Sequence, residues 1–202
     1  MLDVGCGTGR FVEAIAEGSK VWAVDPSREM LGVARRRAPG VRFKQASAEA
    51  LPFKDGWFER ATMWLVVHLV DRPRAFEEVR RVLAPGGKLA LATFDPSYFG
   101  VFWLRDYFPS MEAVDRARFP GAEDLAAELP AAGFGRPRVI RLSQQRTITR
   151  DKALEGIRAK HIATFDLISD EEYEAGLAHA ERELPKRVDY RQEWLIAVAE
   201  AA

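Results

Sequence analysis

Three glycines alternate near the start of the chain, in the run Gly5-Cys6-Gly7-Thr8-Gly9. An apolar stretch at residues 1–4 precedes the run, and a helical pattern at residues 10–17 follows it. A strand, a glycine turn and a helix in this order present backbone N–H groups and the positive end of a helix dipole to a ligand. Glycine is needed because a side chain would block close backbone approach or disfavour a positive φ. An ordinary tight turn, the competing interpretation, rarely needs three alternating glycines. The run therefore predicts a ligand-binding turn.

The first half of the chain alternates strand and helix patterns, which is typical of a parallel α/β sheet. After the strand at residues 1–4, further strands are expected at 20–24, 41–44, 58–67 and 88–94. Helices are expected at residues 10–17, after Ser27 and after Asp71, since Ser and Asp are good N-caps. Their expected buried faces carry Phe11, Ala14 and Ile15; Met30, Leu31 and Ala34; and Phe76, Val79 and Leu83.

The second half is less regular. Residues 95–120 are rich in aromatic side chains, with a helix expected at about 100–116. Further helices are expected at 122–132, at 149–162 and after a capping box formed by Ser169 and Glu172. Strands are expected near 138–142 and at 194–199. We interpret the chain as one domain, with a core at 1–145 and 187–202 and a helical insertion at about 146–186.

Composition excludes several classes of protein. Thirty Lys and Arg balance thirty Asp and Glu, which argues against a nucleic-acid partner bound through a basic surface and against a polybasic membrane anchor. The single cysteine, Cys6, excludes an internal disulfide and a multi-thiolate zinc site, and no metal is expected. No apolar run reaches the roughly 18 residues that span a bilayer. We expect a soluble, cytoplasmic protein without a membrane partner, and a homodimer is left open.

A carboxylate, Asp25, ends the second expected strand, where it is placed to accept hydrogen bonds from the two vicinal hydroxyls of a ribose. The dinucleotide fingerprint G-x-G-x-x-G would require glycine at position 10, which is Arg10. A phosphate-binding P-loop is excluded because no Gly-Lys-Ser/Thr follows. A nicotinamide-dependent oxidoreductase is therefore disfavoured, although it stays among the alternatives.

The run Leu2-Asp3-Val4-Gly5-Cys6-Gly7-Thr8-Gly9 resembles motif I of the class I S-adenosylmethionine-dependent methyltransferases, especially the UbiE-type enzymes that act on small molecules. Similar segments follow in the family's order: Val24-Asp25-Pro26-Ser27, Ala48-Glu49-Ala50-Leu51-Pro52-Phe53, residues 58–71, and Arg81-Val82-Leu83-Ala84-Pro85-Gly86-Gly87-Lys88-Leu89. The resemblance covers about residues 1–95. It implies an α/β, Rossmann-like, doubly wound sheet of strand order 3-2-1-4-5-7-6, with the last strand antiparallel.

The resemblance also implies roles at matching positions. Asp3 would order the glycine loop, Asp25 would bind the ribose of S-adenosylmethionine, and Leu65 would lie under its methionine part. The other implied cofactor contacts are Gly5, Gly7 and Gly9 to the methionine part, and Ala48 and Glu49 beside the adenine. Ser47 stands where many relatives have Asp. The helix that precedes motif I in relatives and covers the cofactor is expected to be absent, since only Met1 and Leu2 come before the motif.

Methyl transfer is an in-line displacement at a carbon activated by the positive sulfonium, so holding the reactants in line is the protein's main task. His68 is the candidate base, because an imidazole titrates near neutral pH; a histidine that packs or caps locally is the alternative. Tyr98, Trp103 and Tyr107 are the candidate contacts to a small-molecule acceptor, against the alternative of a helix that packs on the core. A catalytically inert relative that only binds the cofactor is the other open class.

Overall fold

The computed structural model describes residues 1–16, 18 and 20–202, and the chain divides into two compact units. Unit 1 comprises Met1–Thr93, Pro120–Ile140 and Leu195–Ala202. Unit 2 comprises Phe94–Phe119 and Arg141–Trp194, and it contains the whole of the expected insertion at 146–186. No helix of the described residues is long and apolar enough to cross a membrane.

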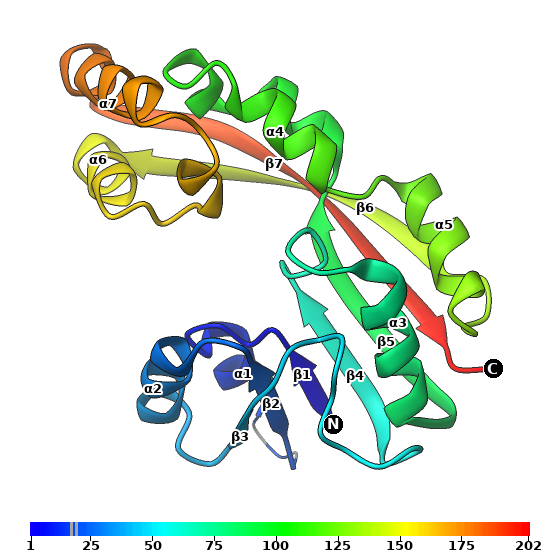
Figure 1. Cartoon of the computed structure of the whole chain (residues 1–202). Coiled ribbons are helices and arrows are strands. Elements are labelled where there is room, and N and C mark those ends of the chain that lie inside the picture. The colour runs from blue at the N-terminus through cyan, green and yellow to red at the C-terminus, as the bar shows by residue number, and fades with distance from the viewer. Residues whose placement is uncertain (17, 19) are drawn as a thin grey trace. The chain divides into compact units, whose positions relative to one another are not determined.

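The strands form one sheet of order β3-β2-β1-β4-β5-β7-β6 (Figure 1), which confirms the order that the family resemblance implies. Strands β1 to β5 pair in parallel, and β7 runs opposite to β5 in Figure 1. Their bounds are β1 Leu2–Val4, β2 Trp22–Asp25, β3 Arg42–Gln45, β4 Phe58–Trp64, β5 Leu83–Phe94, β6 Arg138–Thr149 and β7 Arg187–Glu200.

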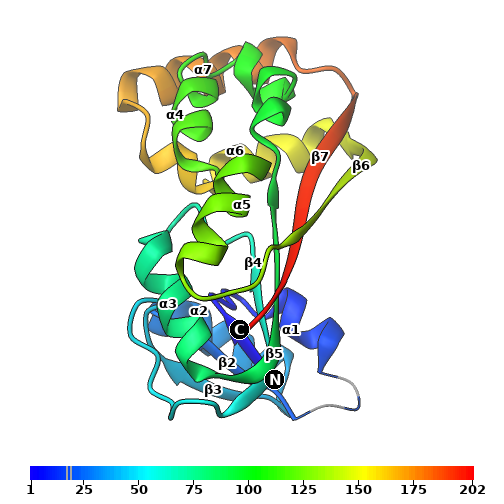
Figure 2. The same cartoon turned by 90° about the vertical axis from the view of Figure 1, so that its right-hand side faces the viewer.

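Unit 1 contains α1 Arg10–Ile15, α2 Arg28–Arg37, α3 Arg72–Val82 and α5 Ala122–Ala131. The expected caps are present: Ser27 Oγ accepts from the Met30 N–H, and Asp71 Oδ1 accepts from the Arg74 N–H. Helices α3 and α5 pack against each other (Figure 1, Figure 2), and the Arg72–Glu128 ion pair at 2.7 Å joins them.

Two apolar clusters hold unit 1 together. One contains residues of β1, β4, β5 and α3, among them Leu2, Met63, Phe76 and Leu91, all at most 1% exposed. The other joins α1, α2 and β2 through residues such as Val12, Ala23 and Leu31. Helices therefore cover both faces of the parallel part of the sheet, as in doubly wound folds.

The buried face of α1 differs from the expected one. Val12 is fully buried, with Ile15 and Ala16 partly buried beside it, whereas Ala14 is exposed. Residues spaced i, i+3, i+4 can be counted from either Phe11 or Val12 in this short helix. The structure buries the set that starts at Val12. In α2, Leu31 and Ala34 are buried as expected but Met30 is 44% exposed. Glu17, the expected end of α1, lies outside the described residues.

Unit 2 contains η1 Pro96–Gly100, η2 Trp103–Asp106, α4 Met111–Arg118, α6 Arg150–Arg158, η3 Ala163–Asp166 and α7 Asp170–Glu183. The single helix expected at about 100–116 is wrong: two 3₁₀ turns precede α4. Pro109 explains where α4 starts, because proline disfavours helical backbone at the residue before it. A core that includes Leu104, Phe108 and Phe165 fills the unit.

Other boundaries shift as well. Strands β6 and β7 are longer than expected, and α6 ends at Arg158, before the expected end at residue 162. Ser169 Oγ caps α7 by accepting from the Glu172 N–H at 3.1 Å, as predicted. The Glu172 carboxylate does not complete the box, however, because it accepts hydrogen bonds from the N–H and hydroxyl of Ser110.

Candidate functional site

The glycine loop connects β1 to α1, and each of its three glycines has a positive φ, at +74° for Gly5, +51° for Gly7 and +80° for Gly9. A Cβ on Gly5 would lie 2.3 Å from Cγ2 of Val66, and one on Gly9 would lie 3.0 Å from Cα of Ala34. A Cβ on Gly7 would meet nothing within 4 Å. The loop is thus tightly packed at both ends and open in the middle, as a cradle for a ligand requires.

Strand β2 anchors this loop. The N–H groups of Gly5 and Cys6 both donate to the Val24 carbonyl, at 2.8 and 3.0 Å. Asp25 accepts from the Gly7 N–H at 2.8 Å through Oδ2 and from the Ser27 N–H at 2.9 Å through Oδ1. Each carboxylate oxygen can accept a further hydrogen bond. Asp25, 8% exposed, therefore positions the loop while keeping acceptor capacity.

Asp3 lies beneath the loop and is 1% exposed. Its Oδ1 accepts a hydrogen bond from Thr62 Oγ1 at 2.6 Å, across the register pair of β1 and β4. Burial raises the pKa of Asp3 to about 7, and the nearby Asp25 carboxylate adds to the rise, while the hydrogen bond from Thr62 opposes it. Sequence reasoning missed Thr62, although a hydroxyl within an apolar strand is a usable signal.

Two predicted residues lie in the loop after β3. Ala48 is buried, and Glu49 is half-buried. Oε1 of Glu49 accepts from the N–H of Asp71, the N-cap of α3, at 2.9 Å. The Glu49 carboxylate therefore joins this loop to the start of α3, a contact that the sequence did not predict.

Helix α3 holds the rest of the loop through a second set of contacts. The Leu51 N–H donates to Glu78 Oε2 at 2.7 Å, and Arg81 donates to the carbonyls of Leu51 and Phe53 at 3.0 and 2.9 Å. Arg81 also pairs with Glu78 at 2.6 Å. These contacts fix the loop to one face of the helix.

Leu65 immediately follows β4 and has a φ of +51°, which is uncommon for a branched side chain. Its N–H donates to the Ala92 carbonyl at 2.8 Å, so the pairing with β5 continues through this residue. His68 is half-buried in the turn that follows, between Val66 and α3. Strained backbone of this kind is concentrated at functional sites.

The predicted residues of unit 1 come together at one edge of the sheet. Strand β1 pairs with β2 on one side and with β4 on the other, so their carboxyl ends are neighbours. Ligands of open α/β sheets bind outside these ends. The residues placed at or after them are Gly5, Gly7, Gly9, Asp25, Leu65 and His68, and the Ala48–Glu49 loop follows the neighbouring strand β3.

The three predicted acceptor residues belong to unit 2. Tyr98 is 1% exposed, with its ring centroid 4.9 Å from that of Phe94 and 4.8 Å from that of Phe102. Burial also raises the pKa of its hydroxyl. Trp103 and Tyr107 are half-buried and pack against the core of unit 2. Contact of Trp103 and Tyr107 with an acceptor stays a prediction, whereas the structure leaves Tyr98 almost no surface for one.

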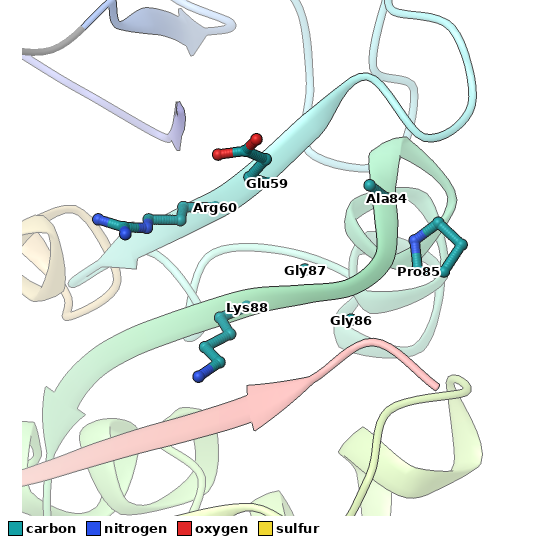
Figure 3. A pocket seen from close by; sticks show the side chains of 7 residues that line it. All are labelled: Glu59, Arg60, Ala84, Pro85, Gly86, Gly87 and Lys88. Atoms are coloured by element: carbon teal, nitrogen blue, oxygen red, sulfur yellow. The ribbon is translucent and has the colours of Figure 1, made fainter.

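A shallow cavity of about 310 Å³ lies at the other end of the strands, near the start of β4 and β5 (Figure 3). None of the predicted site residues is among those that line it. In Figure 3 the charged ends of Arg60 and Lys88 lie apart rather than converging on one point. The lining residues are Glu59, Arg60, Ala84, Pro85, Gly86, Gly87 and Lys88.

The family model of a methyltransferase domain matches residues 2–91. The demethylmenaquinone methyltransferase of Thermus thermophilus is 36% identical over 163 residues, which cover 66% of this chain and 73% of that protein. The chain belongs to the class I S-adenosylmethionine-dependent methyltransferases.

Other similarities agree with this family. The demethylmenaquinone methyltransferase of Renibacterium salmoninarum is 42% identical over 104 residues, half of this chain and 44% of that protein. Among solved structures, an S-adenosylmethionine-dependent methyltransferase of Thermotoga maritima matches with a TM-score of 0.61 and 24% identity, covering 100% of this chain and 81% of that one. At such low identity the structural match supports the fold alone.

The cofactor of this family is S-adenosylmethionine, and the residues at the carboxyl edge fit it. The open middle of the glycine loop at Gly7 leaves room for a ligand against the backbone. Asp25 retains acceptor capacity beside that opening, which two ribose hydroxyls would require. Family membership also excludes the alternative function of a nicotinamide-dependent oxidoreductase.

Proposed function

We propose that this methyltransferase transfers a methyl group from S-adenosylmethionine to a small-molecule acceptor of the hydroquinone class. The observation that carries the proposal is the 36% identity with a demethylmenaquinone methyltransferase, of which this chain covers 73%. A second relative with that name is 42% identical over a shorter stretch. The balance of thirty basic and thirty acidic residues supports a small acceptor rather than a nucleic acid.

In the proposed site, Asp25 accepts the ribose hydroxyls, and the glycine loop lies along the methionine part. Ala48 lies beside the adenine, and Glu49 holds that loop through its hydrogen bond to the Asp71 N–H. Leu65 lies under the methionine part at the end of β4. When bound, the cofactor supplies a methyl carbon that its sulfonium makes electrophilic.

The protein then contributes orientation, the exclusion of water and acid–base chemistry. Orienting the nucleophile in line with the methyl group lowers the entropic part of the barrier. His68 is the proposed base, which accepts the proton that the acceptor gives up; it is half-buried in the turn after β4, at the edge where the cofactor residues gather. The proposed acceptor contacts in unit 2 are the half-buried Trp103 and Tyr107, whereas Tyr98 is 1% exposed and packs on Phe94 and Phe102 instead.

A labelled methyl group tests the proposal. The chain would be incubated with S-adenosylmethionine carrying a deuterated methyl group and with chemically reduced demethylmenaquinone, and the products would be analysed by mass spectrometry. We expect the label on the quinol ring, with no labelling of duplex DNA or tRNA in parallel reactions. Tight cofactor binding in calorimetry together with no transfer to any acceptor would favour an inert relative instead.

A further inference from the structure

Two aromatic rings stack on each other beside the glycine loop. The centroids of Phe11 and Trp64 are 4.6 Å apart, and the ring planes differ by 14°. Trp64 keeps 38% of its surface exposed, and Phe11 is partly exposed. In a near-parallel stack each ring covers one face of the other, so the outer faces and edges of the pair are what remain for a further flat group.

The stack lies next to the residues of unit 1 that are proposed to bind the cofactor. Phe11 lies in the first turn of α1, two residues after Gly9. Trp64 is the last residue of β4, and Leu65 with its φ of +51° follows it. Packing between Gly5 and Val66 also brings the glycine loop against the turn after β4. Both rings therefore lie at the carboxyl edge, among the residues proposed to bind the cofactor.

We infer that the Phe11–Trp64 stack is a binding surface for the planar ring of the methyl acceptor, an inference that rests on the proposed function. The fused rings of a naphthoquinol present a flat apolar face comparable to that of an indole, and such faces stack favourably. A sulfonium also binds aromatic faces. A sulfonium is compact, however, so it would cover a smaller part of the exposed indole of Trp64 than a fused-ring acceptor would.

A second exposed tryptophan provides a matched control. Trp57 is 53% exposed and precedes the other end of β4, where it stacks on Phe58 with centroids 6.3 Å apart. It lies away from the carboxyl edge of the sheet. Replacing Trp57 removes as large an exposed ring from the same unit without touching the proposed surface.

The test uses the variants Trp64→Leu, Trp64→Phe and Trp57→Leu. Binding of 1,4-naphthoquinone is measured by isothermal titration calorimetry, and the KM values for demethylmenaquinol and S-adenosylmethionine are measured separately. Far-UV circular dichroism checks that each variant is folded. Trp64→Phe keeps an aromatic ring, so it is informative even where Trp64→Leu does not fold.

We expect Trp64→Leu to weaken the binding of 1,4-naphthoquinone and to raise the acceptor KM by roughly two- to tenfold, with the cofactor KM unchanged. Trp64→Phe should recover most of the acceptor affinity, and Trp57→Leu should resemble the wild type. A rise in the cofactor KM alone, or an unchanged acceptor KM and an unchanged naphthoquinone affinity in a folded Trp64→Leu variant, would overturn the inference. Naphthoquinone binding that Trp64→Leu weakens and Trp57→Leu does not, without any methyl transfer, would support the surface while rejecting the proposed function.

Discussion

Replacing Asp3 by Asn should change how the stability of the chain depends on pH. The pKa of Asp3 is about 7 in the folded chain, against an ordinary value of 3.8, mainly because the side chain is buried. The folded state therefore keeps a proton that the unfolded state releases between these pH values. Stability accordingly falls as the pH rises through this window, and the loss is complete above pH 7.

The structure sets the size of the effect. A rise of about 3 pKa units corresponds to about 4 kcal/mol over the whole window, of which about 2–3 kcal/mol falls between pH 5 and pH 8. Asn is nearly the same size, keeps an oxygen that accepts the hydrogen bond from Thr62, and carries no charge. The gain in unfolding free energy from Asp3→Asn should therefore be larger at pH 8 than at pH 5 by about 2–3 kcal/mol.

Urea denaturation of both proteins at pH 5 and pH 8, followed by circular dichroism, measures this difference. The exposed Asp151 supplies the control, because Asp151→Asn should show no comparable change between the two pH values. An advantage of Asp3→Asn that is equal at both pH values, or smaller at pH 8, would refute the claim that burial holds Asp3 in its neutral form.

Two further pairs of variants test the loops around the site. Gly5→Ala should lower the free energy of unfolding by roughly 2–5 kcal/mol, because its Cβ would lie 2.3 Å from Val66 in addition to the positive φ. Gly7→Ala has only the penalty of a positive φ and should lose only about 1–2 kcal/mol of unfolding free energy. Equal losses for the two variants in urea titrations would contradict the packing argument. Glu49→Ala should cost about 1 kcal/mol and weaken cofactor binding, because the Asp71 N–H loses its acceptor. Glu49→Gln keeps an accepting oxygen and should bind the cofactor as the wild type does. If calorimetry finds that both variants bind the cofactor equally weakly, the charge of Glu49 and not its hydrogen bond is responsible.

The sequence predicted the part of the fold in which local signals agree with the final structure. The glycine loop, Asp25 at the end of β2 and the caps Ser27 and Asp71 all lie where the pattern indicated. The two caps are determined by interactions between residues close in sequence, an N-cap oxygen and the first turn of its helix. The glycine loop and Asp25 are marked by their residue types, although the contacts between them join residues 18 positions apart.

Long-range contacts escaped prediction. The hydrogen bond from Thr62 to Asp3 joins two strands far apart in sequence, and the stack of Phe11 on Trp64 joins a helix to a strand. The periodicity of apolar residues along the sequence does not indicate which distant residues will pair. The length of β6 was also underestimated, because its mostly polar and exposed residues lack the apolar alternation by which strands are recognised.

The central claim is that the carboxyl edge of β1, β2 and β4 holds S-adenosylmethionine, with Asp25 on the ribose. Isothermal titration calorimetry of the wild type and Asp25→Ala with S-adenosylmethionine tests it most directly. The account predicts saturable binding to the wild type and a loss of about 1–3 kcal/mol in the variant, the scale of hydrogen bonds to charged groups. A dissociation constant that is the same for both proteins would show that the ribose is held elsewhere.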